Sequence, residues 1–478
     1  MTKTMNQSIN QLKPLSYAVD TDSKISIGGL KVEDLIAQYG SPLYLVCEDT
    51  IRERARAYEQ AFAEHYPEHL VIYASKAFNC QEMCRIIATE QLGLDVVSGA
   101  ELYTALAVNF DPARIIFHGN NKSREELELA LAHGVTIVLD NRYELQMIEE
   151  IMASKKISQP NRGLCDEMNT DVNERLANLS KVSLLIRITP GIECHTHEYI
   201  KTGKIDSKFG FDINELDEII TRLKDLQSKS ETELELRGLH AHIGSQIFET
   251  IPHRDTVEVL VKLYAEIQDK HDLKFADLNV GGGLGIKYQE SDDPPEIETM
   301  VKTITDALNE FCPKYGVDKP RVMVEPGRSI AGPAGMTVYK VGNIKNIPGV
   351  RKYVAVDGGM ADNVRPIMYQ AVYQAEIDGQ ALSPEASEQD IANYNAGLEK
   401  VTVAGKYCES GDILIQEAQL PEIEHGDTLA IFSTGAYNYS MASNYNRATK
   451  PPVVMVKDGE SKVIIKGESY DDLLQHDV

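Results

Sequence analysis

The chain has 478 residues, 42% of them hydrophobic and 25% charged, which is typical of a globular protein long enough for two or three domains. Its 48 Lys and Arg against 73 Asp and Glu give a net charge of −25, which argues against nucleic acid or an anionic membrane as a partner. No apolar run approaches the length that spans a membrane, and the first residues lack the apolar segment of a secretory signal.

The seven cysteines are odd in number and unevenly spaced, so they do not form the pattern of a disulfide framework. We therefore expect a reducing, cytoplasmic location. Two groups hint at zinc: Cys80 with Cys84, and Cys194 with His195 and His197. The C-x3-C pair has no second pair at zinc-finger spacing, and buried thiols explain such cysteines more often. We expect no metal, with zinc as the lesser alternative.

The middle of the chain repeats one pattern, a short β-branched run that ends in a polar or glycine-containing turn and precedes a helix-like stretch. Helical periodicity is clear over 123–134, 212–229 and 252–271. The eight runs are HLVIYASKA, LGLDVVSGA, RIIFHGN, TIVLDN, SLLIRITP, LRGLHAHIG, DLNVGGG and RVMVEPGR. Eight strand–helix units in roughly 260 residues predict an α/β fold, a (β/α)8 barrel. A doubly wound sheet is the alternative, but its glycine fingerprint would come early and here the glycines come late.

The segment 155–175 is polar and without periodicity, which indicates a surface insertion between the fourth and fifth units. After Gly332 strand-like runs such as MTVYKVGNIK and GDTLAIFS alternate with turn signals, and few helical stretches occur. We therefore expect three parts: an N-terminal segment, 1–50, that contributes to a β domain, the barrel over 51–332, and a C-terminal mainly β domain over 333–478.

In a barrel of this kind the active-site groups follow the C-terminal ends of the strands. Each group found there also has an ordinary structural explanation, and Lys76 alone would be expected to be a solvated strand end. Together they resemble one site. The groups are Lys76, Asp95, Ser98, His118, His242, Ser245, Gly281, Gly282, Gly283, Glu325 and Arg328.

Three of these features combine into one chemistry. We expect the glycine-rich turn GGGLG (281–285) to open a helix and to offer backbone N–H groups to a phosphate. The amine of Lys76 can form an imine with an aldehyde. The carboxylate of Glu325 can hold a pyridine nitrogen protonated, which makes the ring an electron sink. The set describes pyridoxal 5′-phosphate.

The chain resembles the fold-type III pyridoxal 5′-phosphate-dependent decarboxylases, and within them the branch that acts on meso-2,6-diaminopimelate. The resemblance runs from about residue 25 to the C-terminus in nine ordered blocks. The blocks are YASKA (73–77), LDVVSGAEL (94–102), HTHEYIKTGKIDSKFGF (195–211), HAHIGSQ (240–246), NVGGGLG (279–285), EPGRSIAGPAG (325–335), DGGMADNVRPIMY (357–369), YCESGD (407–412) and TGAYNYSMASNYN (434–446).

The resemblance implies a role for each matching residue. Lys76 would carry the cofactor, His242 would lie against its ring, and Glu325 would bind its ring nitrogen. Arg328 and Arg365 would meet the substrate carboxylates. The phosphate ligands would be Ser245, Gly281, Gly282, Gly283, the backbone around Gly327 and the hydroxyl of Tyr437, and Tyr369 would assist the arginines.

The resemblance also implies a homodimer with shared active sites. Cys408 would come from the partner subunit as the proton donor, and Glu409 as the ligand of the distal ammonium. The products would be L-lysine and CO2, in the last step of lysine biosynthesis. The mobile segment over the substrate would include His195 and His197.

Three alternatives remain. A decarboxylase of ornithine, arginine, lysine or carboxynorspermidine would favour an acidic residue where this chain has Arg365. A binding or regulatory protein would be expected to lose Lys76 or the CES block, and both are present. A racemase of this architecture tends to place arginine at the pyridine nitrogen, and Glu325 argues against it.

Overall fold

The computed structural model describes residues 12–192, 207–383 and 385–478. The chain divides into two compact units. The barrel unit consists of Ala55–Gly285 and Pro295–Gly327. The β unit consists of the chain up to Arg54, the short segment Ile286–Pro294, and Arg328–Val478. None of the helices in the described ranges is long and apolar enough to cross a membrane.

The barrel unit is a closed parallel barrel of eight strands, in the order β10-β11-β12-β5-β6-β7-β8-β9. The predicted barrel is thereby confirmed, and each of the eight apolar runs supplies one strand. The strands are β5 (His69–Ala74), β6 (Gly93–Val96), β7 (Ile115–Phe117), β8 (Thr136–Leu139), β9 (Lys181–Arg187), β10 (Glu233–His240), β11 (Asp277–Asn279) and β12 (Arg321–Val324).

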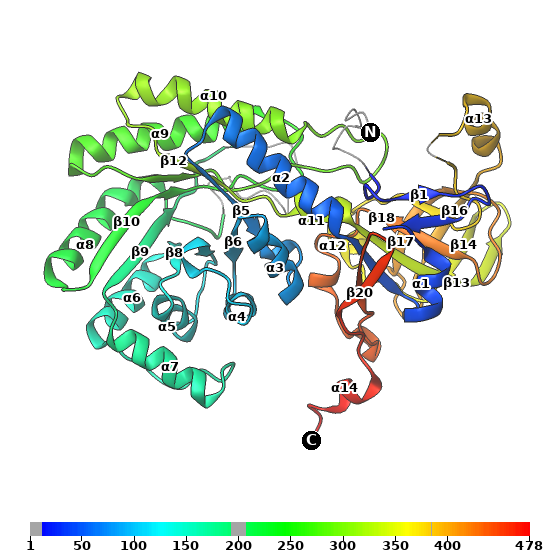
Figure 1. The fold of residues 1–478 in the computed structure, drawn as a ribbon, viewed down its shortest axis with the longest axis horizontal. Helices are drawn as coiled ribbons and strands as arrows, with labels where there is room; N and C mark the ends of the chain where they lie inside the picture. Colours follow the sequence, from blue (N-terminus) through cyan, green and yellow to red (C-terminus); the bar gives the residue numbers. More distant parts are fainter. Residues whose placement is uncertain (1–11, 193–206, 384) are drawn as a thin grey trace. The chain divides into compact units, whose positions relative to one another are not determined.

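Apolar side chains from several of these strands form a buried cluster, among them Ile72, Val138 and Met323, each at most 2% exposed. Helices between the strands lie around the outside of the barrel (Figure 1). They are α2 (Glu48–His65), α3 (Gln81–Thr89), α4 (Gly99–Leu106), α5 (Arg124–Ala132), α6 (Arg142–Ser154), α7 (Asp166–Ala177), α8 (Leu216–Lys229), α9 (Ile251–His271) and α10 (Ile297–Tyr315). The three predicted helical stretches correspond to α5, α8 and α9.

The expectation of an aperiodic insertion over 155–175 is wrong for its second half, which forms α7. Its sequence is mostly polar, but Val172 and Leu176, four residues apart, are buried on one face. Asn169 stabilises the preceding loop, because its side-chain amide forms hydrogen bonds with the backbone of Asn161, Leu164 and Cys165. A short apolar stripe and one buried amide therefore order a segment whose composition indicated a loop.

The β unit is built on a nine-stranded mixed sheet. Its central strand β13 (Gly335–Ile347) pairs with β4 (Leu43–Cys47) from the N-terminal part of the chain and with β18 (Thr428–Phe432). A small sheet of β1 (Ala18–Val19), β2 (Ile25–Ile27) and β3 (Leu30–Lys31) is separate. The remaining strands are β14 (Arg351–Val356), β15 (Ala375–Ile377), β16 (Glu399–Ala404), β17 (Ile413–Leu420), β19 (Val453–Lys457) and β20 (Glu460–Ile465).

Few helices occur in the β unit, as predicted, and they are short. They are α1 (Val32–Tyr39), α11 (Arg328–Ala331), α12 (Arg365–Tyr369), α13 (Glu388–Ala396) and α14 (Tyr470–Leu474). Two apolar clusters form its core. One contains Val354, Val403 and Leu429, and the other contains Leu45, Val338 and Val454. The mainly β character that the sequence predicted is confirmed.

Candidate active site

Lys76 lies just beyond the first barrel strand, in the single 3-10 turn Ser75–Ala77 that follows β5. Its side chain is 39% exposed, and its Nζ is 3.9 Å from Oδ2 of Asp95 on the neighbouring strand β6. Asp95 is only 1% exposed, and burial raises the pKa of its carboxyl. The side chain is therefore partly exposed, and its amine faces a buried carboxyl.

Glu325 lies directly after β12, at the same end of the barrel, and is 6% exposed. Three polar side chains surround its carboxylate. Nε2 of His118 is 2.8 Å from Oε1, Nδ2 of Asn279 is 2.7 Å from Oε1, and Nε2 of His240 is 3.1 Å from Oε2. Burial alone would raise the pKa of Glu325, but the two histidines hold it well below its usual value. This carboxylate is therefore ionised although it is buried.

The glycine turn after β11 holds the backbone in conformations that only glycine adopts without strain. Gly281 and Gly283 have φ of 68° and 129°. A Cβ on Gly282 would lie 2.1 Å from the backbone oxygen of Glu325. The expected helix does not begin here, because an isolated bridge joins Leu284 to Ile247 and the next helix, α10, begins only at Ile297. The prediction of a helix N-terminus at this turn is wrong.

His242 and Ser245 lie in the loop after β10, and both are half-buried. Nδ1 of His242 accepts a hydrogen bond of 3.2 Å from the backbone N–H of Gly282, so the ring and the glycine turn are held together. Burial, with Lys76 nearby, lowers the pKa of His242 well below its usual value. Ser98, by contrast, has a structural role, because its hydroxyl caps the N-terminus of α4.

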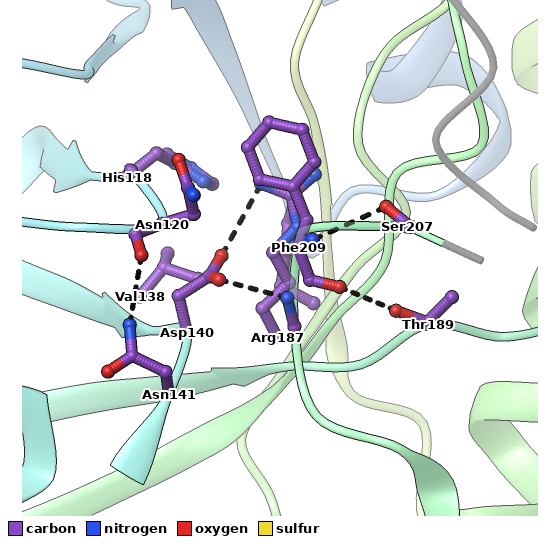
Figure 2. Close-up of polar contacts among 12 residues, drawn as sticks. His118, Asn120, Val138, Asp140, Asn141, Arg187, Thr189, Ser207 and Phe209 are labelled. Carbon is purple, nitrogen blue, oxygen red and sulfur yellow. Dashed lines mark hydrogen bonds and ion pairs between the residues drawn. The ribbon is translucent and has the colours of Figure 1, made fainter. Parts of the chain in front are cut away.

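Arg187, the last residue of β9, is a buried cation that the sequence reasoning missed. Its guanidinium carbon is 4.2 Å from the centroid of the Phe209 ring, and its Nη1 is 3.8 Å from Oδ2 of Asp140. Figure 2 shows the side chains of Phe209 and Asp140 beside the arginine. Oδ1 of Asp140 also accepts a hydrogen bond from the backbone N–H of Gly210. The chain after residue 206 is thus fixed to the ends of β8 and β9. Arg187 is the last residue of a predicted strand, and that position was the signal in the sequence for a site residue.

In the β unit two buried arginines lie among tyrosines. Arg328, the first residue of α11, donates from Nη1 to the hydroxyl of Tyr288 at 2.5 Å. Arg365, the first residue of α12, donates from Nη1 to the hydroxyl of Tyr373 at 2.5 Å. The two phenol rings meet edge to face with centroids 5.3 Å apart. The guanidinium of Arg328 also lies 4.8 Å from the ring centroid of Tyr437.

The charge of Arg365 is not neutralised by an acidic side chain, because no carboxylate in the described ranges forms an ion pair with it. Burial would raise the pKa of Tyr288, but the two neighbouring guanidiniums outweigh it and lower that pKa. A buried cation of this kind is a site for an anion. No pattern in the sequence indicated Tyr288 or Tyr373, because their contacts depend on how the chain folds.

The remaining predicted residues lie at the edge of the β unit. Tyr369 is half-buried at the last position of α12, one helical turn from Arg365. Cys408 and Glu409 are exposed on the loop between β16 and β17. The backbone N–H of Cys408 donates to Oδ1 of Asn446 at 3.2 Å, so Asn446 orders this loop.

Cys194, His195 and His197 lie outside the described residues. Cys80 caps the N-terminus of α3, and the thiol of Cys84 contacts the side chain of Asn79. One group of metal-ligating side chains occurs in the part of the chain that the structure describes: His118, His240 and Glu325. The 3.1 Å contact of His240 with Glu325 is a hydrogen bond, and the 2.8 Å contact of His118 with Glu325 is a close polar contact.

The barrel has a partly exposed lysine after its first strand, a glycine turn after its seventh strand and an ionised carboxylate after its last strand. This combination defines a class of enzyme. Residues 48–332 match the family model of the pyridoxal-binding domain of pyridoxal-dependent decarboxylases, so the chain is a decarboxylase of this class. Within the class it belongs to the diaminopimelate decarboxylase family. The resemblance inferred from the nine sequence blocks is confirmed.

Its relatives match over nearly their whole length. The chain is 44% identical to the diaminopimelate decarboxylase of Synechocystis sp., over 98% of this chain and 92% of the relative. It is 45% identical to that of Bacillus subtilis, over 95% of both chains. Among solved structures, the diaminopimelate decarboxylase of M. jannaschii in complex with L-lysine is 30% identical, with a TM-score of 0.81 and 99% of both chains covered.

Proposed function

We propose that the chain uses pyridoxal 5′-phosphate to decarboxylate meso-2,6-diaminopimelate to L-lysine and CO2, the last step of lysine biosynthesis. The observation that carries the proposal is the pair of groups at one end of the barrel: the partly exposed side chain of Lys76 and the buried carboxylate of Glu325, whose pKa is held low. Membership of the family and the L-lysine complex of the M. jannaschii relative support the same substrate class.

The residues of the barrel unit fit the cofactor. We assign Lys76 to its covalent attachment, His242 to its ring and Glu325 to its ring nitrogen. A side chain at position 282 would collide with the backbone oxygen of Glu325, so glycine is required there. A glycine turn suits the close approach of a phosphate to the backbone. The further phosphate ligands that we propose are Ser245, Gly281, Gly283, Gly327 and, on the family resemblance alone, Tyr437.

Each residue then contributes a defined step. Bound pyridoxal 5′-phosphate supplies an electron sink for the pair released when the bond from Cα to the carboxylate breaks. Glu325 keeps a proton on the ring nitrogen, and the arginines Arg328 and Arg365, with Tyr369, hold substrate carboxylate so that the reacting bond is oriented. The thiol of Cys408 returns a proton to Cα.

We propose a homodimer in which Cys408 and Glu409 serve the active site of the partner subunit, with Glu409 binding the distal ammonium. Both side chains are exposed, although the loop that carries them is anchored to Asn446. An exposed proton donor and an exposed carboxylate on an ordered loop suit a role outside their own subunit.

We also propose a cytoplasmic location. The six cysteines among the described residues are all free thiols. Free thiols are usual in a reducing compartment.

The covalent assignment is tested with Lys76→Ala. Treatment of the cofactor-loaded wild type with borohydride should fix the cofactor to one peptide that contains residue 76, and the variant should take up no label there. Lysine production should fall by at least about 1,000-fold, because attachment and proton transfer are both lost. Lys274→Ala, which removes a surface ion pair with Asp318, is the control and should behave as the wild type. Label on another lysine in the wild type would contradict the assignment.

The shared site is tested by mixing two inactive variants. Lys76→Ala and Cys408→Ala subunits, unfolded and refolded together, should regain activity, because some mixed dimers contain one site with both residues intact. Each variant refolded alone is the control. If the mixture is no more active than the sum of its parts, Cys408 acts within its own subunit.

A further inference from the structure

Three side chains from three strand ends converge on the carboxylate of Glu325. His118 follows β7, His240 ends β10 and Asn279 ends β11, and each is at most 4% exposed. The amide of Asn279 is oriented by its own second contact, since its Oδ1 accepts the backbone N–H of Gly281 at 2.9 Å. Its Nδ2 must therefore donate to Glu325.

The contacts occupy the carboxylate unevenly. An ionised carboxylate offers about four acceptor positions, two on each oxygen. His118 and Asn279 both face Oε1, at 2.8 and 2.7 Å, whereas among the described residues only His240 contacts Oε2, at 3.1 Å. One acceptor position on Oε2 is left for a ligand.

His240 acts as a neutral donor. His240 is fully buried, and its Nδ1 has no hydrogen-bond partner in the described ranges, so a second proton on the ring would be unsolvated. Burial lowers the pKa of His240 to about 4. The Nε2–H tautomer is the one that can donate to Glu325. The edge-to-face contact of the two rings, with centroids 4.7 Å apart, holds His118 against His240.

Asp95 shows what burial does without such donors. It lies at the same barrel end and is 1% exposed, and neither of its oxygens accepts a hydrogen bond from the described residues. Nζ of Lys76 and Nε2 of His118 each lie 3.9 Å from one of its oxygens. Burial raises the pKa of Asp95, whereas the pKa of Glu325 is lowered. Because both carboxyls are buried, the polar side chains that contact Glu325 account for the opposite directions of the two pKa shifts.

We propose that His118 and His240 are positioning residues that keep Glu325 ionised and turn the open acceptor of Oε2 toward the protonated ring nitrogen of the cofactor. The proposal rests on the proposed function, which assigns Glu325 to that nitrogen. The histidines themselves touch neither substrate nor cofactor. They affect the reaction only by positioning Glu325.

The test follows the proton on the ring nitrogen. Wild type and the double variant His118→Phe/His240→Phe are loaded with pyridoxal 5′-phosphate labelled with ¹⁵N in the ring, and the ¹⁵N chemical shift is followed from about pH 6 to about pH 9. The nitrogen should stay protonated throughout in the wild type and lose its proton within this range in the double variant. The kcat of the double variant should fall about 10- to 100-fold, the loss expected for hydrogen bonds to a charged group.

Three further variants separate the possible causes. His240→Gln keeps a donor near the position of Nε2 and should restore most of the protonation and activity. His133→Phe, at the C-terminal end of α5, is the control for loss of a histidine elsewhere. If the double variant does not fold, as judged by circular dichroism, His240→Asn carries the test, because its shorter amide does not reach Oε2.

A ring nitrogen that stays protonated over the whole range in the double variant, with kcat within about threefold of the wild type, would overturn the proposal. Failure of the proposed function gives a different result. If Glu325→Gln itself leaves the nitrogen protonated, the assignment of Glu325 is wrong, whatever the histidine variants show. If borohydride fixes no cofactor to Lys76 in the wild type, the proposed function fails before the histidines are tested.

Discussion

Replacing Asp362 with Asn should remove a pH dependence from the stability of the β unit. Asp362 is 2% exposed. Its Oδ1 accepts the backbone N–H of Gly359 at 2.9 Å, and its Oδ2 accepts the hydroxyl of Tyr339 at 2.6 Å. The hydroxyl of Tyr407, next to Cys408, lies 3.5 Å from Oδ1. Burial raises the pKa of Asp362 from 3.8 to about 7, and these hydrogen bonds only partly offset the effect.

The sign and size follow from proton linkage. Between pH 3.8 and about 7 the folded state holds a proton on Asp362 that the unfolded state has lost. The free energy of unfolding therefore falls as pH rises through this window and levels off above it. About three pKa units correspond to about 4 kcal/mol at most. Asn is neutral at every pH and keeps an amide where Oδ2 met Tyr339, so the variant lacks this loss.

The assay is urea unfolding of wild type and Asp362→Asn at about pH 4.5 and about pH 8. The difference in unfolding free energy between the two proteins should grow by about 2 to 4 kcal/mol in favour of the variant from the lower to the higher pH. Any constant cost of the substitution cancels in this comparison. A difference that does not change with pH would refute the raised pKa of Asp362.

Two other substitutions test the described contacts. Lys122→Met should cost about 3 to 5 kcal/mol in urea unfolding, because it leaves the buried carboxylate of Glu144 without its ion-pair partner at 2.9 Å. The double variant Lys122→Met/Glu144→Gln should recover part of the lost stability. A Lys122→Met variant as stable as the wild type would contradict this prediction. Tyr288→Phe should raise KM for meso-diaminopimelate about tenfold with little change in kcat, because Arg328 loses an acceptor that orients it. Steady-state kinetics decides this, and an unchanged KM would exclude Tyr288 from substrate binding.

The barrel was predictable because each of its strands is a short β-branched run that ends in a turn, a signal local to the sequence. The strand-end groups Lys76, His118 and Glu325 followed from that count, since parallel strands bring their C-terminal ends together. For the β unit, the sequence predicted its type and a contribution from the N-terminal segment, but not the order in which its strands pair. Its sheet includes β4, and that pairing of Leu43–Cys47 with β13 joins segments nearly 300 residues apart.

The errors have physical causes. Residues 281–285 contain the glycines of a phosphate-binding turn, but positive φ at Gly281 and Gly283 and the bridge from Leu284 to Ile247 prevent a helix from beginning there. The helix α7 was missed because its apolar contact is only two residues wide. The surroundings of Arg365 could not be predicted, because Tyr373 is recognisable as its partner only once the fold is known.

The most direct test of the central claim is a product assay. The purified chain, loaded with pyridoxal 5′-phosphate and given meso-2,6-diaminopimelate, should release L-lysine and CO2 in equal amounts. Ornithine, arginine and lysine should turn over far more slowly, because they offer no distal carboxylate to a site that contains Arg365. No lysine from diaminopimelate, or faster turnover of ornithine or arginine, would contradict the proposed function.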